Sequence, residues 1–499
     1  MNTSVIIAVV ILYEIVSIGG CALYLKMKER KNKGGQAAAG DDFSTGGQSM
    51  TWPVVGASLA LSLLGTVKIF GIMQQAINLG AVVAWFSIAT IFPLIMISLG
   101  TGRWVRRLKV ATMPELFGKM YGQKIRLFVC AVIALQTFVI LTIETQGLGT
   151  VFNALSAGKV SVAMGAIIGG IIGIFYVIIA GMKEVGMVNV VNVIVMYVGL
   201  IAAAIILGHV LPGNGWSDFE AYFMSSGQEH MLNFFGAPGV FFSFALNNIL
   251  ALLCAQSVSQ MGVQSAIAAR SEKDIKRAVL VSAPVNGIFG LITMTMGLAG
   301  KYMETGNLSL PEGVKATGQA IGTQVIIQMM PGWVVCLLLA AFLGAILSTF
   351  AITTMALGSI FLNNIYILKH RDASEKQKTM VVRIMIVITG VVAMAIASKL
   401  PNIINSANWS FAWITPLFFT LVFGLFWKQS RVGAAATMGV SWIVILLYTF
   451  TPLPSVLGIT LPLIYIVLIV CIVVGVISYA VTKGERGYMI LWKEEHGIR

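Results

Sequence analysis

The sequence predicts an all-α integral membrane protein with about thirteen transmembrane helices. Of its 499 residues, 58% are hydrophobic and only 10% are charged, and the mean hydropathy is +0.90. Soluble domains carry about 25% charged residues. Apolar stretches of about 20 residues, long enough to cross the ~30 Å hydrocarbon core of a bilayer, recur from one end of the chain to the other. The sequence therefore leaves no room for a large soluble domain.

Polar and Gly/Pro-rich stretches divide the chain into these spans. The first apolar run lacks a basic N-terminal region and a small-residue cleavage site, and it contains Glu14. We therefore expect a retained helix and not a signal peptide. Residues 304–330 indicate an interhelical loop with an amphipathic helix of its own. The predicted spans are 4–25, 52–79, 81–101, 126–155, 160–181, 187–211, 238–265, 278–300, 332–367, 381–399, 404–427, 432–450 and 457–481.

The basic residues predict the orientation of the spans. With the N-terminus outside, nearly all of the 33 Lys and Arg residues fall in cytoplasmic loops or in the tail after residue 482. This asymmetry follows the positive-inside rule, so we expect a multi-pass plasma-membrane protein with an external N-terminus and a cytoplasmic C-terminus. The net charge of +14 is spread over separate loops, which indicates contact with membrane lipid and not with nucleic acid. The five basic residues that lie outside the predicted cytoplasmic loops and tail are Lys68, Lys159, Lys301, Lys315 and Lys399.

Two of the predicted spans are poor continuous helices. The second holds Gly65, Thr66 and Gly71 around Lys68, and the seventh contains the polar run AQSVSQMGVQS at 255–265. The two lie five spans apart. Inverted-repeat carriers place their site at such paired, interrupted helices, where unwound backbone offers carbonyls and amides to solute and ion. The other interpretation is that small and polar residues only allow neighbouring helices to pack closely.

Lys68 is the most unusual residue of these spans, because a charge at mid-membrane costs ~3 kcal/mol on insertion scales. Three interpretations stay open. Lys68 could bind a carboxylate on a solute, it could pair with Glu144 in the middle of the fourth span, or its ammonium could substitute for a bound cation. The first two can coexist if an arriving anion displaces Glu144.

A second group of polar residues lies within 332–367. Ala345, Ser348 and Thr349 offer a carbonyl and two hydroxyls on about one helical turn. Neutral oxygens suit a monovalent cation better than Zn²⁺ or Ca²⁺, which prefer nitrogen and sulfur ligands or several carboxylates. Hydroxyls in membrane helices also bond to their own backbone, so a purely structural role is the alternative.

Short motifs lie in a fixed order along nearly the whole chain. They are DFSTGGQSMTW at 42–52, GASL at 56–59, T-x-P-E at 112–115, AARS at 268–271, A-x-x-S-T at 345–349, PL at 416–417, GLFWK at 424–428 and GA at 433–434. In this order they resemble the sodium/solute symporter family, which includes bacterial proline, galactose, sialic-acid and pantothenate carriers. Gln48 stands where the family usually has Arg.

The resemblance implies an inverted-repeat (5+5) transporter core with one extra N-terminal and two extra C-terminal helices. The chain would then divide into 1–51 (extra helix and basic cytoplasmic loop), 52–212 (first repeat), 213–237 (external loop), 238–427 (second repeat) and 428–499 (two helices and cytoplasmic tail).

The resemblance also implies the residues of two sites. Sodium would be held by the carbonyls of Leu61, Leu64 and Ala345 and by the hydroxyls of Ser348 and Thr349. Alignment on the GASL motif puts Lys68, Ser87, Ser259 and Gln260 on solute-facing positions, with Glu144 flanking the same cavity.

Two acids of the family pattern are amides here, namely Asn189 and Asn364. With Lys68 added, we expect a more positive cavity, in which sodium binds weakly unless an anionic solute is present.

These features predict a secondary active transporter that couples sodium to the symport of a small carboxylate or amino-acid-like solute by alternating access. The alternative is a proton-coupled or sodium-independent carrier or exchanger, in which Lys68 replaces cation charge. We expect sodium but no organic cofactor. An enzyme is not expected, because the four histidines, His209, His230, His370 and His496, show neither metal-ligand spacing nor a nucleophile–base pair.

Overall fold

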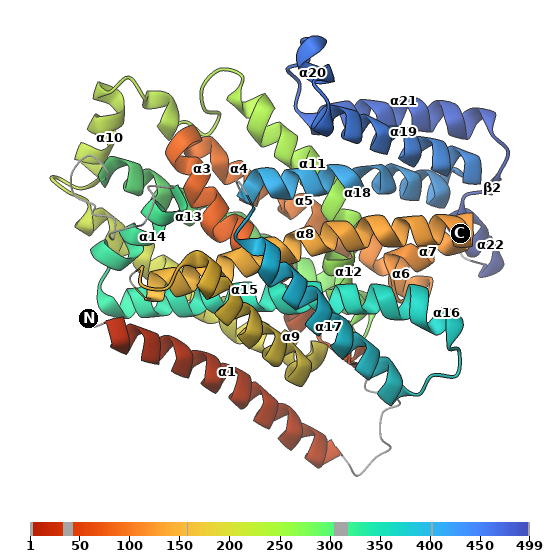
Figure 1. Cartoon of the computed structure of the whole chain (residues 1–499), viewed down its shortest axis with the longest axis horizontal. Helices are drawn as coiled ribbons and strands as arrows, with labels where there is room; N and C mark the ends of the chain where they lie inside the picture. The colour runs from red at the N-terminus through yellow and green to blue at the C-terminus, as the bar shows by residue number, and fades with distance from the viewer. Residues whose placement is uncertain (1–2, 33–42, 157, 304–317, 401–402, 498–499) are drawn as a thin grey trace.

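The chain folds into a bundle of helices, most of which run roughly along its longest axis (Figure 1). The computed structural model describes residues 3–32, 43–156, 158–303, 318–400 and 403–497. Within these ranges, 11 helices are long and apolar enough to cross a membrane. Large apolar side chains are exposed on the outer helices, for example Ile179 at 71% and Val481 at 76%. The chain is thus a multi-pass membrane protein.

The helices before residue 240 include the first interrupted span and the two longest helices. They are α1 (Thr3–Asn32), η1 (Gly46–Gln48), α2 (Trp52–Ser62), η2 (Val67–Gly71), α3 (Ile72–Leu79), η3 (Gly80–Ala84), α4 (Trp85–Ala89), α5 (Ile91–Met96), η4 (Ile97–Thr101), α6 (Gly102–Arg107), α7 (Met113–Tyr121), α8 (Gln123–Leu155), α9 (Val162–Val210), α10 (Trp216–Ser225) and η5 (Glu229–Leu232).

The helices after residue 240 include the second interrupted span and the central helix α15. They are η6 (Phe241–Leu246), α11 (Asn247–Val258), α12 (Gln260–Ile267), α13 (Glu272–Met303), α14 (Gly318–Met329), α15 (Gly332–Phe361), η7 (Leu362–Tyr366), α16 (Ile367–Lys369), α17 (Glu375–Ala397), α18 (Ile403–Phe426), α19 (Arg431–Phe450), α20 (Leu453–Val456), α21 (Leu463–Val481) and α22 (Tyr488–Glu495).

The difference between eleven long helices and thirteen predicted spans has two sources. Helix α9 covers two predicted spans, which meet at Gly181 with φ 63° and ψ 175°. The predicted span 52–79 is divided, so that α2 is a short helix of its own and the following residues continue into one long apolar segment, Val67–Arg107. The count of thirteen and the 5+5 arrangement therefore stay predictions.

Both helices that the sequence marks as interrupted are broken in the structure. Helix α2 ends at Ser62, Gly65 adopts a φ of +32°, and the chain resumes as the π-helical turn η2. Helices α11 and α12 are separated by Ser259, which has the extended values φ −65° and ψ 133°. Helices α2 and α12 both pack on α15, which is buried along nearly its whole length.

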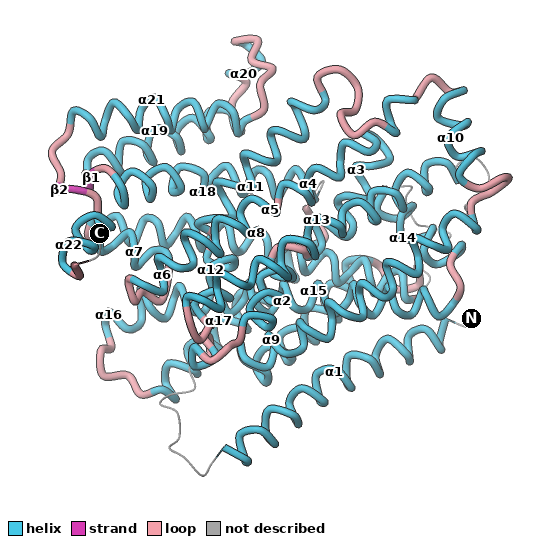
Figure 2. The backbone as a smooth tube through the Cα atoms, turned by 180° about the vertical axis from the view of Figure 1, so that it is seen from behind, coloured by secondary structure: helices cyan, strands magenta, loops and turns pink. Residues whose placement is uncertain are grey.

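Strand structure in the described ranges is confined to one short pair. Strand β1 (Lys428–Gln429) pairs antiparallel with β2 (Glu485–Arg486), with Lys428 opposite Arg486, beside the C-terminal helix α22 (Figure 2). A separate backbone bridge joins Met50, before α2, to Ala269, after α12. This bridge connects the segment before the first broken helix to the segment after the second.

Candidate functional site

A small cavity lies where the two broken helices meet. Its volume is about 30 Å³, which is room for one or two water molecules. The walls come from the break after α2, from α4, α8, α11, α12, α15 and α18, and they combine apolar and polar side chains. The lining residues are Ser62, Leu63, Leu64, Gly65, Val67, Lys68, Phe86, Thr90, Ile140, Glu144, Leu252, Gln256, Met261, Thr349 and Phe411.

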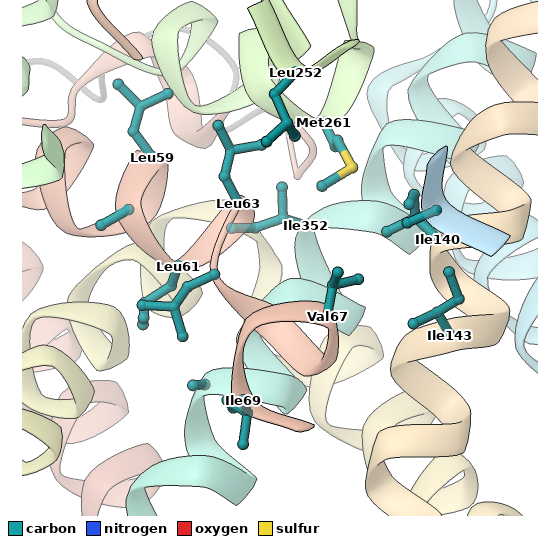
Figure 3. Packing of buried hydrophobic residues seen from close by; sticks show 14 of the residues in the cluster. Leu59, Leu61, Leu63, Val67, Ile69, Ile140, Ile143, Leu252, Met261 and Ile352 are labelled. Atoms are coloured by element: carbon teal, nitrogen blue, oxygen red, sulfur yellow. The ribbon is translucent and has the colours of Figure 1, made fainter. Parts of the chain in front are cut away.

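The apolar part of this wall is continuous with the protein core. Figure 3 shows Leu63 beside Leu252 and Met261, and Val67 facing Ile140 of α8. These side chains separate the break from bulk water, so polar groups that line the cavity act in a medium of low dielectric constant.

Lys68 lies on the cavity wall and is only 1% exposed. Its ammonium donates a hydrogen bond to Oδ1 of Asn286 on α13. Asn286 is itself held in place, because its Nδ2 donates to the carbonyls of Ala60 (3.1 Å) and Ser282 (3.0 Å). The side chain of Lys68 therefore points into the protein and not toward lipid.

Glu144 is also 1% exposed, but its hydrogen-bond partner is Thr66 at the break and not Lys68. The carboxylate accepts hydrogen bonds from the Thr66 amide (2.8 Å) and the Thr66 hydroxyl (2.9 Å). A Cβ on Gly65 would lie 2.3 Å from Glu144 Oε1, so only glycine fits against it. Among the ion pairs of the described residues, none joins Lys68 to Glu144.

The residues that the family resemblance assigns to sodium lie beside this break. The Thr349 hydroxyl is 2.6 Å from the Leu61 carbonyl and 3.1 Å from the Ala345 carbonyl. Ser348 Oγ is buried and has no partner among the described residues. The Leu64 carbonyl accepts only a long 3.4 Å bond from the Lys68 amide. The cluster thus contains oxygens whose lone pairs are free to meet a cation.

Three other predicted solute-facing residues lie around the cavity without lining it. Ser87 donates to the Asn286 carbonyl at 2.5 Å, and Ser259 is buried with no hydroxyl partner in the described part of the chain. Both polar atoms of the Gln260 side-chain amide form hydrogen bonds. Its Oε1 accepts from the Met113 amide at the start of α7 (2.8 Å), and its Nε2 donates to Gln264 (2.9 Å).

Two polar residues of this region, Asn286 and Gln256, are not predicted by the motifs. Gln256 lines the cavity with its Oε1 unpartnered within the described ranges. Asn286 lies two residues after Pro284, in the middle of helix α13. An asparagine two residues after a proline within a predicted membrane span is the sequence signal that could have indicated its role.

The two amides that replace family acids have different neighbours. Asn189 donates to the Ser58 hydroxyl at 3.2 Å. Asn364 donates to the Thr112 hydroxyl (3.0 Å) and accepts from Arg126 Nε (2.8 Å). The bond between Asn364, in η7, and Thr112 joins the T-x-P-E motif at the start of α7 to the end of α15.

Comparisons with known proteins agree with this arrangement. A family model described as SSF: Sodium:solute symporter family matches residues 43–441. The chain is 26% identical over 256 residues to the human sodium/iodide cotransporter, a match covering 50% of this chain and 39% of that protein. It is 24% identical over 377 residues to mouse sodium-coupled monocarboxylate transporter 1, covering 73% and 60%. Both matches span less than two thirds of the relative's length.

Solved structures share the fold. A Na⁺-coupled sialic acid symporter in a substrate-bound, outward-open state superposes with a TM-score of 0.78 at 18% identity, covering 97% of this chain and 99% of that one. MhsT in complex with L-phenylalanine superposes with a TM-score of 0.53 at 15% identity, covering 87% and 99%. At these identities the likeness is one of fold.

Proposed function

Because the chain belongs to the sodium:solute symporter family, we propose that it couples sodium entry to the transport of a small organic solute that carries a carboxylate. Monocarboxylates and amino-acid-like molecules are the favoured classes. Transport proceeds by alternating access, in which the two interrupted helices open the central cavity to one side of the membrane at a time.

The observation that carries this proposal is the buried ammonium of Lys68. It has three donors, and its hydrogen-bond partner is the neutral amide oxygen of Asn286. A buried charge is costly unless it is paired, and a solute carboxylate would supply both charge and hydrogen-bond acceptors. The human and mouse relatives are named for iodide and monocarboxylate, which supports a small anion as the cargo.

The size of the cavity limits how the solute is held. About 30 Å³ is too small for a carboxylic acid with more than a few heavy atoms, so helices must separate before it binds. Leu252, Met261 and Phe411 line the apolar side and would pack against the carbon part of the solute, while Lys68 and Gln256 provide the polar side.

Sodium would bind to the carbonyls of Leu61, Leu64 and Ala345 and the hydroxyls of Ser348 and Thr349. The Ser348 Oγ, which has no partner in the described part of the chain, and the closeness of the Thr349 hydroxyl to two carbonyls support this set. An ion there would connect α2 to α15 and favour one orientation of the carrier. Lys68 repels the ion until an anion arrives, so each ligand strengthens binding of the other.

The other predicted residues would act in the opened cavity. Ser259 has a hydroxyl at the break of the second helix that can meet the solute directly. Ser87 would first exchange its present bond to the Asn286 carbonyl for a bond to solute. Gln260 would face the solute but keep its bond to the Met113 amide. Glu144 fixes the break beside Lys68 and flanks the bound anion.

Proteoliposomes that contain the full chain test the proposal. Uptake of labelled monocarboxylates and amino acids is measured under an imposed sodium gradient and, separately, under a proton gradient. We expect sodium-driven uptake, reduced at least about 10-fold in Lys68→Met because a hydrogen bond to a charged group is worth ~1.5–3 kcal/mol. The matched control is Lys301→Met, whose ammonium donates to the Ile77 carbonyl at 3.0 Å.

Binding is measured in parallel as the shift in thermal stability caused by each carboxylate. If the best carboxylate stabilises Lys68→Met as much as the parent protein, the anion-binding role of Lys68 is wrong. Uptake driven by protons and indifferent to sodium would refute the sodium coupling.

A further inference from the structure

A second pocket lies away from the central cavity, at the end of the bundle where α1, α9 and α17 meet. Its volume is about 350 Å³, within the ~300–1,000 Å³ range of small-molecule pockets. Helices α1 and α17 both pack on α9, and Figure 1 shows the C-terminal end of α1 and the N-terminal end of α17 close together. The lining residues are Ala22, Leu25, Lys26, Phe43, Gly46, Ala180, Gly181, Met182, Lys183, Glu184, Thr379 and Arg383.

Three cationic side chains from three different helices surround this pocket. Lys26 comes from α1, Lys183 from α9 just after the break at Gly181, and Arg383 from α17. Among the described lining residues the opposing charge is Glu184, so these residues carry a net charge of +2. A neighbouring pocket of about 260 Å³ shares Thr379 and Arg383 and adds one charge of each sign, from Glu375 and Lys376.

Arg383 is held in position to receive an anion. Its guanidinium lies 5.1 Å from the centre of the Phe43 ring, and its Nε is buried without a partner among the described residues. Planar guanidinium groups bind phosphate through two parallel hydrogen bonds, so an acceptor of this kind would satisfy the free donor.

The surroundings of the pocket are apolar and face outward. Lys26 is the second-last residue of the apolar segment Val5–Met27, so it lies at the level where hydrocarbon meets headgroups. Exposed apolar side chains on all three helices adjoin the basic residues. They are Leu23 (62%), Met27 (58%), Ile179 (71%), Met380 (57%) and Ile384 (49%).

We infer that this pocket binds the phosphate headgroup of an anionic membrane lipid, with the acyl chains along the exposed apolar side chains. Lys26, Lys183 and Arg383 contact the phosphate. Glu184 Oε1, which is buried and unpartnered in the described part of the chain, accepts a hydrogen bond from a headgroup hydroxyl. Phosphatidylglycerol, a phosphodiester with two such hydroxyls, therefore fits better than a bare phosphate. The bound lipid holds α1 against α9 and α17.

The test uses the purified full chain and two readouts that do not depend on transport. Native mass spectrometry counts bound phosphatidylglycerol, and thermal unfolding measures its stabilising effect against phosphatidylcholine with the same acyl chains. We expect one retained phosphatidylglycerol and a larger stabilisation than phosphatidylcholine gives. Lys26→Gln and Arg383→Gln should each weaken phosphatidylglycerol binding about 10-fold, the effect of losing one charged hydrogen bond.

Lys124→Gln is the matched control, because Lys124 is an exposed cation at the start of α8 that lies outside the pocket. Lys26 is exposed as well, so Lys26→Gln stays informative if Arg383→Gln does not fold. Equal effects of Lys26→Gln and Lys124→Gln would overturn the inference. So would full stabilisation by inorganic phosphate or glycerol 3-phosphate, which would identify a soluble phosphate as the ligand.

Discussion

The two broken helices have similar positions in the chain but their polar groups are used differently. At the first break, the Thr66 amide and hydroxyl bond to Glu144, and Lys68 bonds to Asn286, so each of these groups has a partner within the membrane-spanning core, although the partner of Lys68 is uncharged. At the second break, the Ser259 hydroxyl has no partner among the described residues, while Gln260 bonds to the Met113 amide of α7.

This difference indicates that ligand binding and the opening of the cavity depend on different residues of the fold. The first break is packed so tightly that its geometry depends on a glycine and a buried carboxylate. The second break is connected through Gln260 and Gln264 to α7, to the Ser44 carbonyl and to the Ser359 hydroxyl. We infer that the first break holds ligands and that the second transmits opening and closing of the cavity.

The largest effect is expected at the first break. Gly65→Ala places a Cβ 2.3 Å from Glu144 Oε1 on a backbone with φ +32°. Overpacking and backbone strain each cost ~1–3 kcal/mol, so sodium-driven uptake should fall at least about 30-fold. At the second break, the Cβ added by Gly262→Ala lies 2.9 Å from the end of the Ile97 side chain and 3.1 Å from the Gln256 carbonyl, on a backbone without positive φ, and the expected loss is under about 3-fold.

Gly439→Ala serves as the control for both glycine variants, because nothing lies within 4 Å of its Cβ position. Uptake and surface expression are measured together. Equal losses in Gly65→Ala and Gly262→Ala would show that the two breaks do not differ in the way proposed.

The next effect concerns the ion. Ser348→Ala removes a buried hydroxyl that we assign to sodium, and we expect the sodium concentration for half-maximal uptake to rise about 10-fold, since one ion ligand is lost. Thr354→Val is the control, because the Thr354 hydroxyl bonds to the Phe350 carbonyl of its own helix at 2.9 Å. An unchanged sodium dependence in Ser348→Ala would remove this residue from the ion site.

A smaller effect distinguishes binding from movement at the second break. Gln260→Leu leaves the Met113 amide without its acceptor, and we expect the maximal uptake rate to fall about 5-fold, for a loss of ~1 kcal/mol. The solute concentration for half-maximal uptake should stay within about twofold of the parent value. The opposite pattern, a raised half-saturation at full rate, would identify Gln260 as a solute-binding residue.

The smallest effect is expected for Ser259→Ala. A single hydroxyl on a solute contributes ~0.5 kcal/mol or more, so half-saturation should rise about twofold with the rate unchanged. Ser257→Ala is matched, because Ser257 is also buried with no hydroxyl partner among the described residues but lies inside α11 and not at the break. Identical behaviour of the two variants would argue that Ser259 is structural.

Much of the architecture could be predicted because its physical causes are local. Runs of apolar residues long enough for a bilayer predict the spans, and the glycines around Lys68 predict the first break, which the structure confirms. The polar run at 255–265 likewise predicts the break at Ser259. These features depend on residues close together in the chain.

The partners of the buried charges could not be predicted in the same way. Lys68 bonds to a residue 218 positions away, and Glu144 to one 78 positions away. A local pattern indicates that a charge needs a partner but does not specify which distant helix supplies it. Lys68 and Glu144 both line one cavity in the structure, while Asn286 and the Thr66 amide, which hold them, were not predicted.

The short contact from the Thr349 hydroxyl to the Leu61 carbonyl has a consequence for the empty carrier. A hydroxyl has one proton, and here that proton occupies the space between α15 and α2 that we assign to the ion. In the proposed cycle, the Thr349 hydroxyl donates to the Leu61 carbonyl again when sodium leaves, and this bond keeps α2 and α15 joined. The sodium-free protein would then change from one orientation to the other with α2 and α15 still in contact.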